Sequence, residues 1–163
     1  MPNRKMHHGF TLIELVIVII VLGIISAVAI PRFINLSSDA KVSVLESIEG
    51  NMRSVASIVH MKGIIEDTPD RAIDADRAIE TNLGLVDSWY KYPESIGEQG
   101  KGYGIVQLIS LDHDGIEVFA ENKSNPDCWS VKVGYDEAVC YVQYKEACSS
   151  EIPPEITVVS TDC

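Results

Sequence analysis

One carboxylate, Glu14, stands near the start of a long apolar segment, and its charge is the first feature that could do chemistry. Residues 15–30 carry no charge. As an α-helix, the stretch from residue 10 to residue 30 would be about 31 Å long, which matches the hydrocarbon core of a bilayer. A carboxylate costs on the order of 3 kcal/mol at mid-bilayer and less near a helix end. Glu14 therefore predicts a charged partner.

Four cysteines form the second chemical group, and all of them follow residue 127. Together with a membrane segment, they indicate disulfides formed in an oxidising compartment. They lack the C-x₂-C spacing of zinc sites, so no metal is predicted. Four cysteines allow three pairings. Cys128 and Cys140 flank Gly134 evenly, so a hairpin turning at Gly134 would pair them and leave Cys148 with Cys163.

Other chemistries lack the residues they need. The chain has no G-x-S-x-G, P-loop or H-E-x-x-H motif, and the glycines of residues 97–104 do not have the spacing of a dinucleotide site. The net charge of −11 opposes binding to nucleic acid, which needs a basic face. We therefore predict no enzyme activity, no cofactor and no nucleic-acid partner.

Hydrophobic periodicity predicts a long helix over residues 10–62. After Pro31 its pattern becomes amphipathic, with apolar residues at spacings of three and four. Gly63 is the expected end of the helix. Pro31 removes a backbone donor, so a kink is expected near residues 27–31, and Gly23 is a second weak point of the helix. The apolar stripe of the amphipathic half consists of Leu45, Ile48, Met52, Val55 and Val59.

The rest of the chain predicts an α+β fold. A variable acidic loop is expected over residues 63–102, with a short helix at 69–82 inside it. From Tyr103 onward, alternating apolar residues predict an antiparallel sheet of about four strands, one face of which packs on the helix stripe. After Ser149 we expect a loop with a short extended piece. The predicted strands are residues 105–111, 116–120, 129–133 and 139–144, with a turn at 112–115.

The motif GFTLIE at residues 9–14, the apolar run behind it and AIP at residues 29–31 resemble the type IV pilin (prepilin) family. The resemblance is specific over residues 1–60 and loose afterwards, apart from the C-terminal cysteines. It implies that residues 1–9 are a leader, which a prepilin peptidase removes by cutting between Gly9 and Phe10 before it methylates the Phe10 amine. It also implies a transmembrane and filament-core helix over 10–31 and a globular pilin domain over 32–163.

This resemblance implies a structural subunit that polymerises with itself into a surface filament, or fimbrium, for adhesion and attachment, with motility as a further role. Glu14 would pair with the Phe10 ammonium of a neighbouring subunit. A Cys148–Cys163 bridge resembles the C-terminal disulfide loop of the family. The chain would cross the bacterial inner membrane once before assembly, and residues 23–31 would lose helicity in the filament.

The implied partners are an assembly platform protein, a motor ATPase and minor pilins. Within the family, the middle and the tail of the chain look most like major pilins of the mannose-sensitive haemagglutinin (MSHA) type.

Three alternatives stay open. The chain resembles a minor pilin or a type II secretion pseudopilin equally well over its first part. Pseudopilins often bind calcium in place of the C-terminal bridge, and Asp112 and Asp114 could supply oxygen ligands. The sequence AVA at residues 27–29 has the form of a signal-peptidase site, which would release a soluble domain beginning at Ile30. Glu14 argues against that reading, because a signal peptide has no acidic residue in its apolar region.

Overall fold

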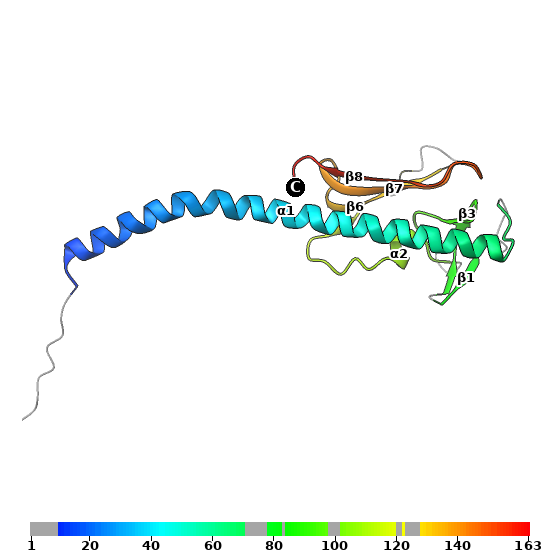
Figure 1. Cartoon of the computed structure of the whole chain (residues 1–163), viewed down its shortest axis with the longest axis horizontal. Helices are drawn as coiled ribbons and strands as arrows, with labels where there is room; N and C mark the ends of the chain where they lie inside the picture. Colours follow the sequence, from blue (N-terminus) through cyan, green and yellow to red (C-terminus); the bar gives the residue numbers. More distant parts are fainter. Residues whose placement is uncertain (1–9, 71–77, 83, 98–101, 120–121, 123–127) are drawn as a thin grey trace, which may run out of the picture. The chain divides into compact units, whose positions relative to one another are not determined.

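A computed structural model describes residues 10–70, 78–82, 84–97, 102–119, 122 and 128–163 of the chain (Figure 1). The chain divides into a first compact unit, Met1–Ser38, and a second, Asp39–Cys163. Helix α1 (Leu12–Ile65) begins in the first unit and continues into the second. Among the described residues, every strand lies in the second unit. The fold is α+β, as the sequence predicts.

In the second unit, α1 is amphipathic and its stripe is buried. Leu45, Ile48 and Met52 are at most 1% exposed, and Val59 is buried as well. Burying one such side chain contributes about 1.5–3 kcal/mol, so this stripe holds the helix on the sheet. The shared core combines Leu45, Ile48, Met52 and Ala56 of α1 with Val131, Val133, Val142, Tyr144 and Ile156 of the sheet.

The helix ends at Ile65, beyond the predicted end at Gly63. The backbone N–H of Thr68 donates to the Gly63 carbonyl at 3.0 Å, and that of Asp67 donates to the Ile64 carbonyl at 3.3 Å. Asp67 has a φ of 52°, in the left-handed region. Together these contacts form a Schellman motif, with Asp67 in the place that glycine usually takes.

Gly63 does not end the helix as predicted, but lies within it where other segments pack closely. A Cβ atom at this position would lie 2.8 Å from the Ile79 Cδ1 atom and 2.9 Å from the Lys91 Cβ atom. The glycine therefore lets two other segments of the second unit approach the helix backbone closely.

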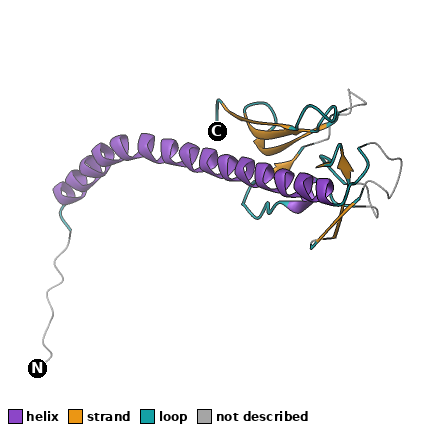
Figure 2. Ribbon diagram, turned by 45° about the vertical axis from the view of Figure 1, so that its right-hand side comes forward, coloured by secondary structure: helices purple, strands orange, loops and turns teal. Residues whose placement is uncertain are grey.

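One antiparallel sheet of four strands packs on α1, with the order β5-β6-β7-β8. Its strands are β5 (Glu117–Val118), β6 (Ser130–Asp136), β7 (Cys140–Lys145) and β8 (Glu155–Ser160). Side chains of β7 alternate between buried and half-buried positions, as expected for a sheet with one covered face. Figure 2 shows this sheet in orange along the second half of α1.

The number of strands is confirmed, but one predicted strand is wrong, and the short extended piece predicted after Ser149 takes its place in the sheet. Residues 105–111 contain the short helix α2 (Ile105–Leu108) instead of a strand. Gln107 accepts hydrogen bonds from the N–H groups of Gly104 at 2.9 Å and Gly97 at 3.3 Å, which stabilises this turn. The fourth strand is β8, in the segment predicted to be mostly loop. It pairs with β7 along its whole length.

The region between α1 and α2 forms two small hairpins. Strands β1 (Ile79–Thr81) and β2 (Gly84–Val86) pair with each other, as do β3 (Ser88–Trp89) and β4 (Tyr92–Pro93). The predicted helix over 69–82 is wrong at its end, where β1 lies, while residues 71–77 are outside the described part. Ile79 of β1 is fully buried beside Val59 and Val86, and this packing, together with the pairing of Ile79 with Val86, holds the segment as a strand.

The predicted disulfide pairs, Cys128 with Cys140 and Cys148 with Cys163, are wrong. The bridges join Cys128 to Cys148 and Cys140 to Cys163. The prediction assumed a hairpin turning at Gly134, but Gly134 lies inside β6 and pairs with Tyr141. A Cβ atom there would lie 2.3 Å from the Cys140 carbonyl, so glycine allows close strand contact instead of a turn.

The observed register explains the observed pairs. Ser130 is opposite Lys145 in the β6–β7 ladder, so Cys128 lies across from the segment that contains Cys148. Cys140 is opposite Ser160 in the β7–β8 ladder. The chain turns after Ser160 and returns Cys163 to Cys140, with the Asp162 N–H donating to the Val139 carbonyl at 3.5 Å.

Candidate functional site

The apolar half of α1 presents an uncovered surface. Leu12–Ile30 has a mean hydropathy of 3.0, and none of its residues is buried within the protein. By length and composition it is a helix that could cross a membrane. Soluble monomers rarely expose apolar patches of more than a few hundred Å², so this surface requires lipid or another protein against it.

Glu14 lies in the first turn of α1 and forms a capping box with Thr11. The Thr11 hydroxyl donates to Glu14 Oε2 at 3.0 Å, and the Thr11 N–H donates to the same oxygen at 3.2 Å. In return, the Glu14 N–H donates to the Thr11 hydroxyl at 3.3 Å. These reciprocal bonds satisfy backbone donors that a helix N-terminus otherwise leaves unpaired.

The capping box was missed at the level of sequence, although its signature was present. A hydroxyl residue three positions before a glutamate, directly ahead of an apolar run, is typical of a helix N-terminus. Its presence gives Glu14 a local role in addition to any role between subunits. No cation of the described residues pairs with the Glu14 carboxylate.

The structure describes three of the other site residues predicted in the apolar half of α1 and the segment before it. Phe10 lies just before α1 and is 75% exposed. Gly9 is outside the described residues. Gly23 and Pro31 both lie within α1, and no atom stands within 4 Å of the place a Gly23 side chain would take. The kink predicted near residues 27–31 stays a prediction.

The acidic segment at residues 112–115 is a turn, as predicted, but it connects α2 to β5 instead of two paired strands. The Ile116 N–H donates to the His113 carbonyl at 3.2 Å, and Gly115 has a φ of 81°, which glycine tolerates. Asp112 and Asp114 are exposed. Across the described ranges, no group of three acidic, histidine or cysteine side chains is arranged to hold a metal ion.

A second carboxylate, Glu146, is buried in the second unit and was also missed in the sequence. Its Oε1 atom accepts hydrogen bonds from the Ser95 N–H at 2.7 Å and the Ser95 hydroxyl at 2.8 Å. Its Oε2 atom accepts one from the Trp129 N–H at 3.1 Å. No local sequence pattern could predict this site, because Ser95 and Trp129 are distant from Glu146 in the sequence and only the fold brings them together.

Tyr144 reinforces the same connection. Its hydroxyl is fully buried and donates to the Pro93 carbonyl at 2.6 Å. Burial, and next the nearby Glu146 carboxylate, raise the pKa of Tyr144 well above its ordinary value. Tyr144 of β7 therefore holds β4, and Glu146 just after β7 holds the segment that follows β4.

Comparison with known proteins gives a consistent picture. Residues 4–30 match the family described as the prokaryotic N-terminal methylation motif. The chain is 31% identical over 108 residues to the type IV major fimbrial protein FimA of Dichelobacter nodosus, covering 60% of this chain and 69% of that protein. No solved structure matches the chain.

Two further relatives match over shorter stretches. The chain is 45% identical over 58 residues to the type IV narrow pilus major component PilA5 of Thermus thermophilus, covering 34% of this chain and 50% of that protein. It is 34% identical over 59 residues to the type II secretion system core protein G of Pseudomonas aeruginosa, covering 36% of this chain and 39% of that protein. The chain thus spans half the length of the Thermus relative.

Proposed function

The chain belongs to the type IV pilin family, and on this premise we propose that it is a structural subunit that polymerises into a type IV pilus. The observation that carries the proposal is the uncovered apolar helix Leu12–Ile30 with one carboxylate in its first turn. Such a surface is stable in lipid as a monomer and against copies of itself in a filament, where each helix covers its neighbours.

The proposed processing concerns the N-terminus. A prepilin peptidase would cut between Gly9 and Phe10 and methylate the new Phe10 amine, and the match of residues 4–30 to the methylation motif supports this step. The cut would leave a positive ammonium directly before α1. Residues 10–31 would then span the inner membrane, with the globular domain outside the bilayer.

Assembly would pair opposite charges. Glu14 lies in the first turn of α1, where its bonds to Thr11 hold the carboxylate beside the helix N-terminus. In a filament, the Phe10 ammonium of a neighbouring subunit would bind this carboxylate in an apolar surrounding. Attraction between charges is far stronger there than in water, so the pair would favour correct axial docking.

Several finer features belong to the same proposal. A motor ATPase and a platform protein would drive assembly, with minor pilins as further partners. Residues 23–31 would lose helicity in the filament, because Gly23 and Pro31 weaken the helix there. The subunit would have no enzyme activity of its own. We place it nearest the MSHA type of major pilin, on the character of its middle and tail, which makes adhesion its expected role.

A second candidate is a pseudopilin of a type II secretion system, which the 34% identity to core protein G favours. The two disulfides weigh toward a pilin, because pseudopilins often have a calcium ion where pilins have the C-terminal bridge. Both candidates share the processing and the membrane helix, and they differ in whether long surface filaments form.

Electron microscopy of the producing cells, with intact-mass measurement of sheared filaments, tests the proposal. We expect surface filaments built from this chain, with a subunit mass that lacks residues 1–9 and includes one added methyl group. A mature chain beginning at Ile30 would establish release by a signal peptidase. A processed subunit that stays in the membrane and never reaches surface filaments would favour the pseudopilin.

A further inference from the structure

A groove of about 210 Å³ opens in the second unit between the side of α1 and the segment that leads into β8. It is large enough for one or two side chains, and it is lined by a mixture of polar and apolar groups. The residues that line it include Arg53, Ser57 and His60 of α1, Tyr92 of β4, and Pro153 and Pro154 before β8.

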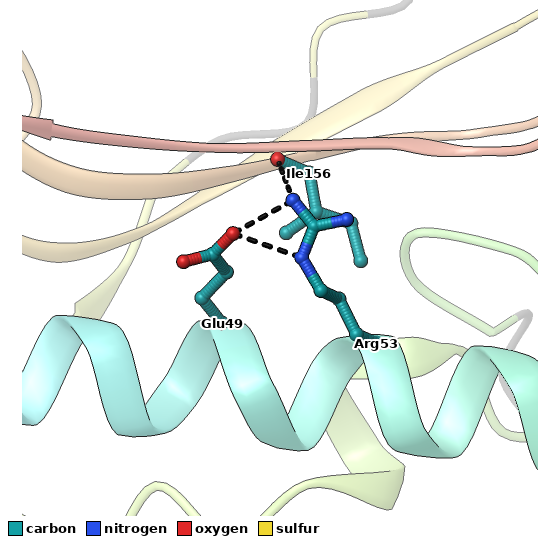
Figure 3. Close-up of polar contacts among 3 residues, drawn as sticks. All are labelled: Glu49, Arg53 and Ile156. Carbon is teal, nitrogen blue, oxygen red and sulfur yellow. Dashed lines mark hydrogen bonds and ion pairs between the residues drawn. The ribbon is translucent and has the colours of Figure 1, made fainter.

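Arg53 lies at one end of the groove, with its side chain 57% exposed and bonded on one side. Its Nε and Nη2 atoms donate to Glu49 Oε1 at 2.9 and 2.7 Å, and Nη2 also donates to the Ile156 carbonyl at 2.8 Å. The third nitrogen, Nη1, forms no hydrogen bond with the described residues. Figure 3 shows it directed along α1 toward its C-terminal side. Two N–H donors of the guanidinium are therefore unused within the described chain.

Two other polar groups of the groove are available as well. Ser57 is exposed and forms no hydrogen bond within the described part of the chain. His60 stacks on Tyr92 with the ring centroids 3.9 Å apart, so its position is fixed. Its Nδ1 atom is buried and has no hydrogen-bond partner among the described residues.

The helix surface next to Ser57 is apolar and uncovered. Ile58 and Met61 follow Ser57 within about one turn of α1, and they are 55% and 53% exposed. Polar receptors beside exposed apolar side chains are the composition expected of a protein–protein contact, in which aliphatic groups supply the burial and a few polar groups fix the geometry.

We propose that this groove receives an acidic side chain from a second copy of the chain, with Arg53 Nη1 and the Ser57 hydroxyl as its donors. The inference rests on the proposed filament, which holds copies side by side. The chain carries 24 acidic against 13 basic residues, so every copy offers carboxylates to its neighbour. Its net charge of −11 repels free anions, whereas a neighbouring subunit is held close by the rest of the interface.

Ser57→Asp tests the proposal, with Ser57→Asn as the matched neutral control. An aspartate at this position would repel the incoming carboxylate and compete with it for Arg53, which lies four residues earlier on the same helix. Because Ser57 has no partner in the described chain, both variants should fold, insert in the membrane and melt as the unchanged subunit does.

We expect Ser57→Asp to reduce sheared filament per membrane-resident subunit by about tenfold, the effect of losing one charge-assisted hydrogen bond per interface. Ser57→Asn should stay near the unchanged level. Equal filament yields from the unchanged chain and Ser57→Asp would overturn this inference and leave the proposed function intact. An unchanged chain that forms no filament would overturn both.

Filament structure determination supplies the second measurement. A carboxylate oxygen of a neighbouring subunit within hydrogen-bond distance of Arg53 Nη1 is the expected result. A groove in the filament that faces solvent, or that holds another part of the same subunit, would overturn the inference even if Ser57→Asp assembles poorly.

Discussion

The two parts of α1 differ in what covers their apolar side chains. Apart from Glu14, Leu12–Ile30 is apolar on all sides, and none of its residues is buried by the described part of the chain. The part in the second unit is apolar along one stripe, and the sheet covers that stripe with Met52 and Leu45 fully buried. The first part therefore depends on lipid or on other subunits, and the second part is stable within its own subunit.

The carboxylates Glu14 and Glu146, one in each region, also differ in their burial and in where their hydrogen-bond partners lie. Glu14 is exposed, and its described partners come from Thr11 within the same helix turn. Glu146 is buried, and its oxygens are satisfied by Ser95 and Trp129, which lie far from it in the sequence. An exposed carboxylate can accept a bond from another subunit, whereas a buried carboxylate bonded to distant segments stabilises the fold of its own subunit.

The largest expected effect comes from Glu14→Gln, which breaks the proposed assembly function of the first region. Glutamine retains the capping box and the side-chain volume but removes the charge. We expect the amount of surface filament to fall by more than about tenfold, because the charge pair with Phe10 in a low-dielectric core is lost. The subunit should still enter the membrane, since the cost of a carboxylate in lipid is gone.

The measurement is membrane-resident subunit and sheared filament in parallel, in cells that supply only this pilin. Glu46→Gln is the control, because Glu46 is exposed on α1 in the second unit. Normal filament from Glu14→Gln would show that the charge pairing is wrong and that the carboxylate serves another step.

Met52→Ala tests the claim that the second region is stable by itself. Truncating this fully buried side chain should lower the free energy of unfolding by about 2–5 kcal/mol, measured by denaturation of the detergent-solubilised subunit. Met61→Ala is the matched control on the same helix, because Met61 is 53% exposed and should change stability little. Equal effects of the two variants would contradict the burial argument.

Removal of one disulfide should weaken the second region to a similar extent. Cys140→Ser combined with Cys163→Ser should reduce stability by about 3 kcal/mol, because the cross-link closes a loop with a sequence separation of 23. Peptide mapping without reduction should first show Cys128 linked to Cys148 and Cys140 linked to Cys163. A Cys128–Cys140 peptide would restore the hairpin prediction at Gly134.

Thr11→Ala should have a smaller effect, confined to the start of α1. The hydroxyl that donates to Glu14 and accepts from its N–H is lost, which costs about 1 kcal/mol of local helix stability. Backbone amide exchange over residues 11–14 should accelerate, while the melting temperature of the second unit stays constant. Thr11→Ser retains the hydroxyl and should restore slow exchange. Unchanged exchange in Thr11→Ala would contradict the capping box.

The smallest expected effect is the pH dependence that His60 confers on the second region. Burial lowers the pKa of His60 below its ordinary value of 6.5. The unfolded chain therefore binds a proton more readily, so stability should decrease as the pH falls through 6.5 toward the lower pKa of the folded state. His60→Gln should reduce this slope of melting temperature against pH. An identical slope in His60→Gln would refute the assignment.

Much of the fold could be predicted because its signals are local. The apolar run, the amphipathic stripe and the alternation of β7 depend on neighbours within a few positions, and the structure confirms each of them. The strand predicted at 105–111 failed for the opposite reason. Its β-branched residues favour a strand, but Gln107 stabilises a helical turn through bonds that depend on the nearby fold.

The sequence by itself determined the family motif, the long helix with its two kinds of surface and the presence of an antiparallel sheet. Only the tertiary structure decided the cysteine pairing, the identity of the fourth strand, the burial of Glu146 and the groove beside Arg53. These features depend on strand register and on segments far apart in the chain. A shift of a few residues in the turn after β6 changes which cysteine lies across from Cys128, and no local pattern encodes that register.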